Sequence, residues 1–268
     1  MNQYKQQVID FFNQRTAYDQ EGLRHPQEAN RLLNFVPLQE RQSVLDIATG
    51  TGLVAIPAAQ KVGAEGYVVG VDFSPGMLAQ ARRKVEVLGL ANIEFNENEV
   101  DAESIEFAVE SFDVIFCCSA ITYLPDIPTT LQKWHYFLKP GGFVAFTCPA
   151  DTAYLASVQA KVYQELFNLF LPHINEPLNT PEKCDRLLRQ AGFREIEVVR
   201  EPSGCYLSLD DPRLGWSGGF YPRGNPLSVL SAQQLEQLQK KYRAEIEQLA
   251  TEGGVWQDMT TFFVKARK

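Results

Sequence analysis

The sequence lacks the charge pattern of a nucleic-acid-binding protein and the long apolar segment of a membrane-spanning one. It holds 25 Lys and Arg against 33 Asp and Glu, a net charge of −8, and its basic residues form no cluster. Nucleic-acid-binding surfaces and segments that bind anionic membranes are normally basic. No apolar run approaches the roughly 20 residues of a transmembrane helix. We therefore expect neither a nucleic-acid partner nor a stable membrane association.

Signals for secretion and for a structural metal are also missing. The N-terminal segment contains no apolar core of the kind found in signal peptides. The five cysteines form no C-x-x-C pair, and the adjacent Cys117 and Cys118 would point to opposite faces of a strand. We interpret the cysteines as small buried side chains of a cytoplasmic protein without a metal site. The oligomeric state stays open.

Alternating patterns predict an α/β fold. The hydrophobic content of 45% suffices for a packed core, and 268 residues suit a single domain, 1–268. Apolar, β-rich runs alternate with helical patterns, which predicts β-α-β units in a mostly parallel sheet with helices on both faces. Strands are predicted at 43–48, 66–72, 92–100, 112–120, 142–149, 193–201 and 259–268, and helices at 53–62, 74–89, 127–139 and 180–192.

Two segments interrupt the alternation. Residues 151–179 form an insertion whose helical apolar stripe fits either an added core helix or a lid over an apolar substrate. Within 180–268, an insertion at 200–257 carries Trp216, Phe220 and Tyr221 on a glycine-rich loop, followed by a polar helix. The loop could form a second wall of a binding site. The remaining parts of the domain are an N-terminal helical cap, 1–42, and a cofactor-binding core, 43–150.

The segment SVLDIATGTGLVAI, residues 43–56, combines a strand with a glycine-rich turn. Gly50, Gly52 and Ala55 fit the fingerprint G-x-G-x-x-G/A of a dinucleotide-binding turn. Such glycines permit a tight turn and close approach of the backbone to a ligand. Asp72 follows about twenty residues later, where the fingerprint places a ribose-binding acid. The fingerprint alone leaves an NAD-dependent oxidoreductase open.

Three acids favour a ligand built from adenosine and an amino acid. Asp46 lies inside the motif, where a carboxylate would repel a pyrophosphate but attract an α-ammonium group. Asp72 ends the next strand, where its two oxygens can accept from both hydroxyls of a ribose. Asp101 follows the third strand and can accept from the adenine amine. Each has a structural alternative: Asp46 would tie down the loop, Asp72 would cap the next helix, and Asp101 would begin a helix.

With these acids in place, the sequence resembles a known family. VLDIATGTG, VVGVDFSPGML, EVDAESIEF, FDVIFCCSAITYLPD and LKPGGFVAFT are similar, in order and spacing, to the motifs of class I S-adenosylmethionine-dependent methyltransferases. The ubiquinone/menaquinone-biosynthesis C-methyltransferase-like group is the most similar, and the segment RTAYDQ resembles its lead-in. The resemblance implies a Rossmann-like, seven-stranded, mostly parallel sheet with an antiparallel last strand and helical lid insertions. Ala48 stands where the family usually has the first glycine of the loop.

The resemblance also implies which residues contact S-adenosylmethionine. They would be Asp46, Ala48, Gly50 and Gly52 along the methionine portion and ribose, Asp72 at the ribose hydroxyls, Phe73 and Met77 beside the adenine, Asp101 and Ala102 at the adenine edge, and Cys117 and Cys118 at the amino group. Phe73 also fits a place in the core.

The implied activity is transfer of a methyl group to the oxygen, carbon or nitrogen of a small, hydrophobic or aromatic organic acceptor. The protein would chiefly align the acceptor and exclude water, and some acceptors need a base. Candidates for a base or acceptor contact are His25, Tyr123, His173 and Tyr18, whereas His135 fits a surface or packing role. Because fold does not fix reaction, an S-adenosylmethionine-binding protein that catalyses a cyclisation, or only binds, is the alternative.

Overall fold

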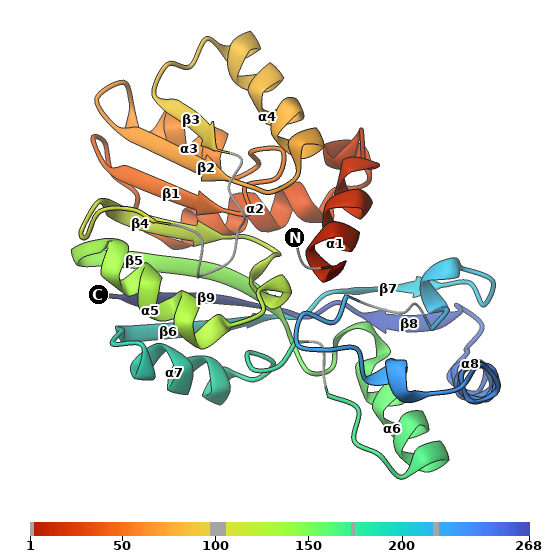
Figure 1. Ribbon diagram of the computed structural model, residues 1–268. Helices are drawn as coiled ribbons and strands as arrows, with labels where there is room; N and C mark the ends of the chain where they lie inside the picture. The colour runs from red at the N-terminus through yellow and green to blue at the C-terminus, as the bar shows by residue number, and fades with distance from the viewer. Residues whose placement is uncertain (1–2, 97–105, 173–174, 217–219) are drawn as a thin grey trace.

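A sheet of seven strands runs through the centre of the protein (Figure 1). In the computed structural model, which describes residues 3–96, 106–172, 175–216 and 220–268, the strand order is β3-β2-β1-β4-β5-β9-β6. The strands are β1 (Ser43–Ile47), β2 (Tyr67–Val71), β3 (Ile93–Asn96), β4 (Phe112–Cys117), β5 (Leu138–Pro149), β6 (Arg194–Glu201) and β9 (Thr261–Arg267). β9 runs antiparallel to both of its neighbours, β5 and β6, and the other described pairs are parallel. The predicted sheet, with its antiparallel last strand, is confirmed.

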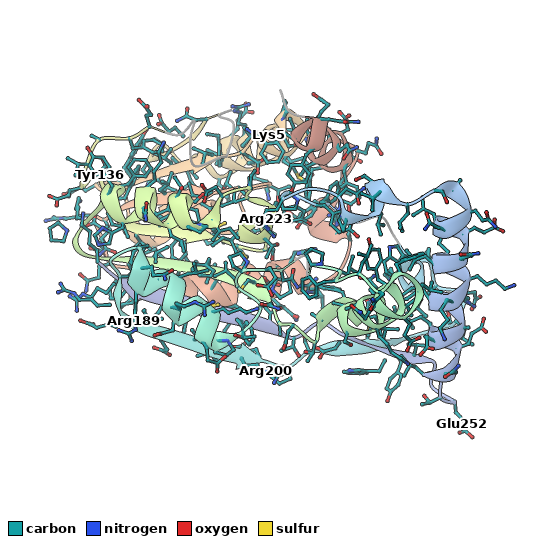
Figure 2. All side chains as sticks on the ribbon, turned by 60° about the horizontal axis from the view of Figure 1, so that its bottom comes forward. Lys5, Tyr136, Arg189, Arg200, Arg223 and Glu252 are labelled. Carbon is teal, nitrogen blue, oxygen red and sulfur yellow. The ribbon has the colours of Figure 1, made fainter. Side chains whose placement is uncertain are left out.

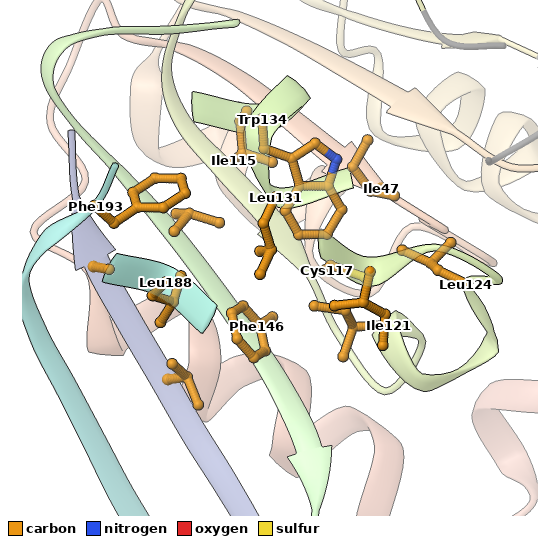
Figure 3. Close-up of a cluster of buried hydrophobic side chains, with 14 of the residues drawn as sticks. Ile47, Ile115, Cys117, Ile121, Leu124, Leu131, Trp134, Phe146, Leu188 and Phe193 are labelled. Atoms are coloured by element: carbon orange, nitrogen blue, oxygen red, sulfur yellow. The ribbon is translucent and has the colours of Figure 1, made fainter. Parts of the chain in front are cut away.

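Helices cover both faces of the sheet. The helices are α1 (Gln3–Asn13), α2 (Arg24–Phe35), α3 (Ala55–Val62), α4 (Pro75–Leu88), α5 (Ile127–Phe137), α6 (Ala156–Phe167), α7 (Pro181–Gln190) and α8 (Ala232–Gln248). On one face, Trp134 of α5 and Leu188 of α7 pack in a core with Phe146 of β5 (Figure 3). On the other, Leu32 of α2 and Ala58 of α3 pack against β1, β2 and β4. Within the described ranges, no helix has the length and apolar character to cross a bilayer.

Local signals set both ends of α4. The Ser74 hydroxyl accepts from the backbone N–H of Met77 at 3.2 Å, and Pro75 occupies the first turn, as predicted. Gly89 ends the helix in the left-handed conformation, with φ 65°. The N-terminus of α4 is thereby fixed directly after β2, at the edge of the sheet where the strands end.

The predicted boundary between α5 and β5 was wrong. The helix ends at Phe137 rather than at residue 139, and β5 begins at Leu138. Pro140 explains the early stop, because a proline disfavours helical geometry in the residue before it. The pairing of β4 with β5 shifts register between Phe112 and Val114, so Gly141 and Gly142 lie within an irregular start of the strand.

The segments that interrupted the alternation form a C-terminal module, which consists of α6, α8 and a two-stranded antiparallel sheet, β7 (Gly204–Leu207) and β8 (Val255–Asp258). Figure 2 shows α8 and Glu252 at the opposite end of the molecule from Tyr136. The module has its own apolar core, in which Val162 of α6 packs with Leu238 and Ile246 of α8. The strands β7 and β8 were not predicted, because 47 residues separate them and no turn signal links them.

The buried face of α6 packs in the core of this module. Val162 and Tyr163 are buried there, and Lys161 pairs with Glu245 of α8 at 2.7 Å. Phe167 is half-buried with its ring 5.3 Å from that of Tyr163, whereas Phe170 is 75% exposed. This packing fits the alternative of an added core helix. A role of the insertion as a lid stays a prediction.

The two phenylalanines test which alternative holds. Phe167→Ala should lower the free energy of unfolding by about 1–3 kcal/mol, because it removes half-buried apolar area from the module's core. Phe170→Ala should change it by less than about 0.5 kcal/mol, as expected for an exposed site. Chemical denaturation of both variants measures the difference. Equal, small effects of both substitutions would contradict the packing role of α6.

Candidate active site

A cavity opens at the carboxyl ends of β1, β2 and β4, beneath the N-terminal helices. It holds about 1120 Å³ of space free of protein atoms, part of it open to solvent. Open α/β sheets bind ligands at this edge, where the strand order reverses, here between β1 and β4. Residues that line it include Tyr4, Lys5, Phe12, Tyr18, His25, Asp46, Ala48, Gly50, Asp72, Phe73, Met77, Cys118, Ser119 and Tyr123. Most of the residues predicted for a cofactor and acceptor site therefore meet in one place.

Asp46 holds the glycine-rich turn to the end of β1. Its side chain is 1% exposed, and Oδ2 accepts from the Thr49 hydroxyl at 2.7 Å and from the backbone N–H of Ala55 at 3.1 Å. Burial raises the pKa of this carboxyl to about 7, although both hydrogen bonds oppose the shift. The loop-tying role considered from the sequence is therefore present in the structure. Asp46 also lines the cavity, so a ligand role is compatible with it.

Asp72 joins the turn after β1 to the turn after β2. Oδ2 accepts from the backbone N–H of Gly50 and Oδ1 from that of Ser74, each at 2.8 Å. Burial raises the pKa of Asp72 to about 6, against the lowering effect of these hydrogen bonds. The backbone N–H of Phe73 is a third partner, and a carboxylate offers about four acceptor sites. The side chain can thus hold both loops and still accept from a ligand.

The small residues of the turn differ in the reason why a larger side chain is disfavoured there. Gly50 has φ 56°, and a Cβ there would meet nothing within 4 Å, so its open side faces the cavity that it lines. Gly52 has φ 80°, and a Cβ would come within 2.9 Å of Ile56 Cδ1. It is absent from the described cavity lining, so packing on α3 accounts for this glycine. Ala48 lines the cavity and adopts φ 54°, a conformation that favours glycine.

The remaining predicted cofactor contacts are placed in part. Phe73 and Met77 line the cavity, and Phe73 also packs on the core. Cys118 lines it too, whereas Cys117 is buried in the core of the opposite sheet face and is absent from the described lining. The two cysteines thus point to opposite faces, as predicted. Asp101 and Ala102 lie outside the described residues, and the cofactor roles themselves stay predictions.

The N-terminal segment is fastened over the cavity by polar contacts. Figure 1 shows α1 beside the start of α4. The Asn13 side-chain oxygen accepts from the backbone N–H of Gly76 at 3.0 Å and from the Ser74 hydroxyl at 2.8 Å. Asp19 pairs with Lys84 of α4 at 2.6 Å and accepts from the Thr51 hydroxyl of the glycine-rich turn. The cover is therefore built on the same loops that Asp46 and Asp72 hold.

Aromatic rings form one wall of the cavity. The ring of Tyr123 lies 6.0 Å from that of Phe12 and 5.7 Å from that of Phe220. Phe220 thus packs on the wall residue Tyr123 but is absent from the described cavity lining, so a second wall formed by the aromatic loop stays a prediction. Trp216 does not reach this wall and instead packs on Tyr242 of the C-terminal module, with ring centroids 5.0 Å apart.

The predicted histidines have separate positions. His25, at the start of α2, lines the cavity and stacks on Tyr18 with ring centroids 4.9 Å apart. His135 lies on α5, away from the cavity. Its ring packs edge-on against that of Phe193, which confirms its packing role. His173 lies outside the described residues. Of the other candidates, Tyr18 and Tyr123 both line the cavity, and burial raises the pKa of each phenol.

A buried carboxylate that sequence reasoning missed joins the cover to the sheet. Glu28 of α2 is 7% exposed, and Oε1 accepts from the hydroxyls of Ser119 at 2.6 Å and Thr147 at 2.5 Å. Arg24 lies 3.5 Å from the other carboxylate oxygen. Ser119 has φ 54°, and its N–H donates to the Thr147 hydroxyl at 2.8 Å. Glu28 therefore fixes the backbone directly after Cys118. Its partners lie 91 and 119 residues away in sequence, so no local pattern reveals them.

Removal of this carboxylate should destabilise the fold. Glu28→Ala leaves two buried hydroxyls and Arg24 without their acceptor, and should lower the free energy of unfolding by about 2–4 kcal/mol. Glu28→Gln should cost less, because its amide oxygen still accepts. Glu201, which pairs with Arg31 and is 38% exposed, is the matched control: its alanine variant should lose less than about 1 kcal/mol. Denaturant titration that finds equal losses for Glu28→Ala and Glu201→Ala would contradict the role of Glu28.

Comparisons with known proteins converge on one kind of enzyme. A family model described as a methyltransferase domain matches residues 44–142. The aklanonic acid methyltransferase DauC of Streptomyces sp. (strain C5) is 33% identical over 205 residues, covering 75% of this chain and 92% of that protein. The demethylmenaquinone methyltransferase of Geobacillus kaustophilus is 34% identical over 192 residues, covering 65% of this chain and 80% of that protein.

Solved structures share the fold at lower identity. The YcgJ protein of Bacillus subtilis superposes with a TM-score of 0.61 at 17% identity, covering 91% of this chain and 99% of that one. A SAM-dependent methyltransferase from Aquifex aeolicus superposes with a TM-score of 0.56 at 17% identity, covering 95% and 97%. Identities this low show the fold alone.

Proposed function

This chain belongs to the S-adenosylmethionine-dependent methyltransferases, and we propose that its acceptor is a small hydrophobic or aromatic molecule held beneath the N-terminal helices. Membership of the family sets aside both the NAD-dependent oxidoreductase and the non-methylating alternatives. The wall of the cavity supports this acceptor class, because the rings of Phe12, Tyr18 and Tyr123 line it together with apolar residues of α1. The similar proteins from Streptomyces and Geobacillus are named for aklanonic acid and demethylmenaquinone, both small organic molecules.

The residues at the strand ends fit the cofactor. When bound, S-adenosylmethionine supplies a methyl group activated by a positively charged sulfur. Asp72 would accept from the ribose hydroxyls beside its backbone partners, and Gly50 leaves the space that a backbone contact needs. Asp46 would face the cationic end, and Phe73 and Met77 would flank the adenine. The protein would contribute orientation and exclusion of water, which together lower the barrier to an in-line displacement.

A ligand panel followed by an acceptor screen tests the proposal. S-adenosylhomocysteine should raise the melting temperature, whereas NAD and NADP should leave it unchanged. Aromatic and aliphatic candidate acceptors are then incubated with S-adenosylmethionine, and mass spectrometry follows the gain of one methyl group. Turnover confined to strongly polar acceptors such as amino acids would contradict the proposed acceptor class.

The ribose role of Asp72 predicts a loss of affinity. Asp72→Asn should weaken binding of S-adenosylhomocysteine by about 1.5–3 kcal/mol, roughly 10- to 150-fold, through loss of a charge-assisted hydrogen bond. Asp113 is a suitable control, because it also accepts from a backbone N–H, that of Ser43, but lies at the other end of the sheet. Asp113→Asn should bind normally in calorimetry. Unchanged affinity of a folded Asp72→Asn protein would rule out the ribose contact.

The raised pKa values of the two acids predict a pH dependence of cofactor binding. Burial holds the pKa of Asp72 near 6 and that of Asp46 near 7 in the free protein, so both protonate as the pH falls through this range. A cationic ligand and ribose hydroxyls favour the ionised acids, so affinity should be full only above about pH 8 and fall as the pH drops through 7 and 6, by up to about tenfold per pH unit for each protonated acid. Calorimetry between pH 5 and 8 measures this. Asp72→Asn should give a shallower slope, and affinity that rises on acidification would contradict the assignment.

A further inference from the structure

His25 differs from the other titratable groups that line the cavity. Burial raises the pKa values of Tyr4, Tyr18, Tyr123 and the Cys118 thiol, so these groups keep their protons at neutral pH. Such groups can donate a hydrogen bond but are poor bases. The strand-end acids, Asp46 and Asp72, are assigned to the cofactor by the proposed function. An imidazole has a basic lone pair at neutral pH, and the His25 ring lines the cavity.

The His25 ring is held in place without a hydrogen bond at Nδ1. It stacks on Tyr18 with an angle of 23° between the rings, and Tyr18 is itself covered by the guanidinium of Arg15, 4.3 Å from the ring centroid. Nδ1 is buried and has no hydrogen-bond partner among the described residues. Because Nδ1 is shielded from solvent while the ring lines the cavity, the other ring nitrogen, Nε2, is the one left to meet a molecule in the cavity.

The charged groups around His25 are paired with one another. Arg24 lies 3.5 Å from Glu28 on the same helix, and Arg15 pairs with Glu21 in the preceding segment. His25 is therefore a neutral base among balanced charges. Such a base serves an acceptor that loses a proton as it is methylated, such as a phenol or an enol, whereas a carboxylic acid is already ionised at neutral pH.

We propose that His25 is the general base of this enzyme and that its acceptors are phenols or enols, methylated on the hydroxyl oxygen. The inference rests on the proposed function. As the hydroxyl oxygen forms its bond to the methyl carbon, the bond between methyl and sulfur breaks and its electron pair stays on sulfur. The hydroxyl proton passes to an imidazole nitrogen of His25. The products are a methyl ether, S-adenosylhomocysteine and an imidazolium ion that returns its proton to water.

The first test compares two histidine variants on a matched panel. Hydroxylated naphthalenes, hydroxyanthraquinones and 1,3-diketones are offered alongside the corresponding carboxylic acids and amines. His25→Gln should lower kcat for the hydroxyl compounds by about 10²- to 10⁴-fold, the usual range for a general base, and leave the affinity for S-adenosylhomocysteine unchanged. His135→Gln, whose ring packs on Phe193 outside the cavity, should behave as the unmodified protein. Added imidazole should partly restore His25→Ala.

The dependence of kcat on pH separates a base from a residue that only supports the fold, because loss of a structural contact would not remove a titration from the profile. Burial, followed by the charge of Arg24, lowers the pKa of His25 below its ordinary value of 6.5. The basic form therefore prevails at neutral pH, and kcat should fall only when the pH drops below 6.5. In His25→Gln this acidic limb should vanish, and the rate should rise with pH as the acceptor ionises by itself.

A binding measurement without turnover completes the test. In protein saturated with S-adenosylhomocysteine, 1-naphthol should shift the NMR signals of the His25 ring but not those of His135, whereas 1-methoxynaphthalene should not change the pKa of His25. Equal kcat and equal pH profiles for His25→Gln and the unmodified protein would overturn the inference, as would turnover confined to the acids or amines. Failure of every panel compound, with S-adenosylhomocysteine still bound, would instead reject the proposed acceptor class, and the inference with it.

Discussion

Two buried carboxylates, at the ends of β1 and β2, are the constraint on which the rest of the site depends. Asp46 and Asp72 accept from four groups of the two following loops, three of them backbone N–H groups. Burial of acids is unfavourable, as their raised pKa values show, so their persistence requires these hydrogen bonds. The bonds fix the turn at Gly50 and the start of α4. A ligand with a positive charge and hydroxyl groups would complete the set of partners.

The cover of the cavity is a second layer built on these loops. Asn13 and Asp19 reach the start of α4 and the glycine-rich turn, and Glu28 reaches the ends of β4 and β5. The residues proposed for the cofactor thus depend on the backbone of the sheet, whereas those proposed for the acceptor depend on side chains of the N-terminal segment. Phe220 packs on Tyr123, while the helices α6 and α8 mostly pack on each other. Because Asn13 and Asp19 contact the two loops directly, a change in the cover would also reach the residues proposed for the cofactor.

Local patterns account for what could be predicted from the sequence. The alternation of strands and helices, the Ser74 cap and the acids that end β1 and β2 are encoded within a few neighbouring residues. The pairing of β7 with β8 and the contacts of Glu28 join distant parts of the chain and leave no local signal. For Gly52 the pattern identified the residue, but the physical reason is packing on Ile56. The stacking of His25 on Tyr18 and the missing partner of its Nδ1 among the described residues likewise become visible only in the folded chain.

The crystal structure of the complex with S-adenosylhomocysteine would test the central claim most directly. If the loop-holding acids also bind the cofactor, the ribose hydroxyls should lie within hydrogen-bonding distance of the Asp72 carboxylate, about 2.6–3.2 Å. The backbone N–H groups of Gly50 and Ser74 should remain on the same carboxylate, as they are without ligand. A ribose bound elsewhere, or a complex in which Asp72 has released both loops to reach the ligand, would contradict the account.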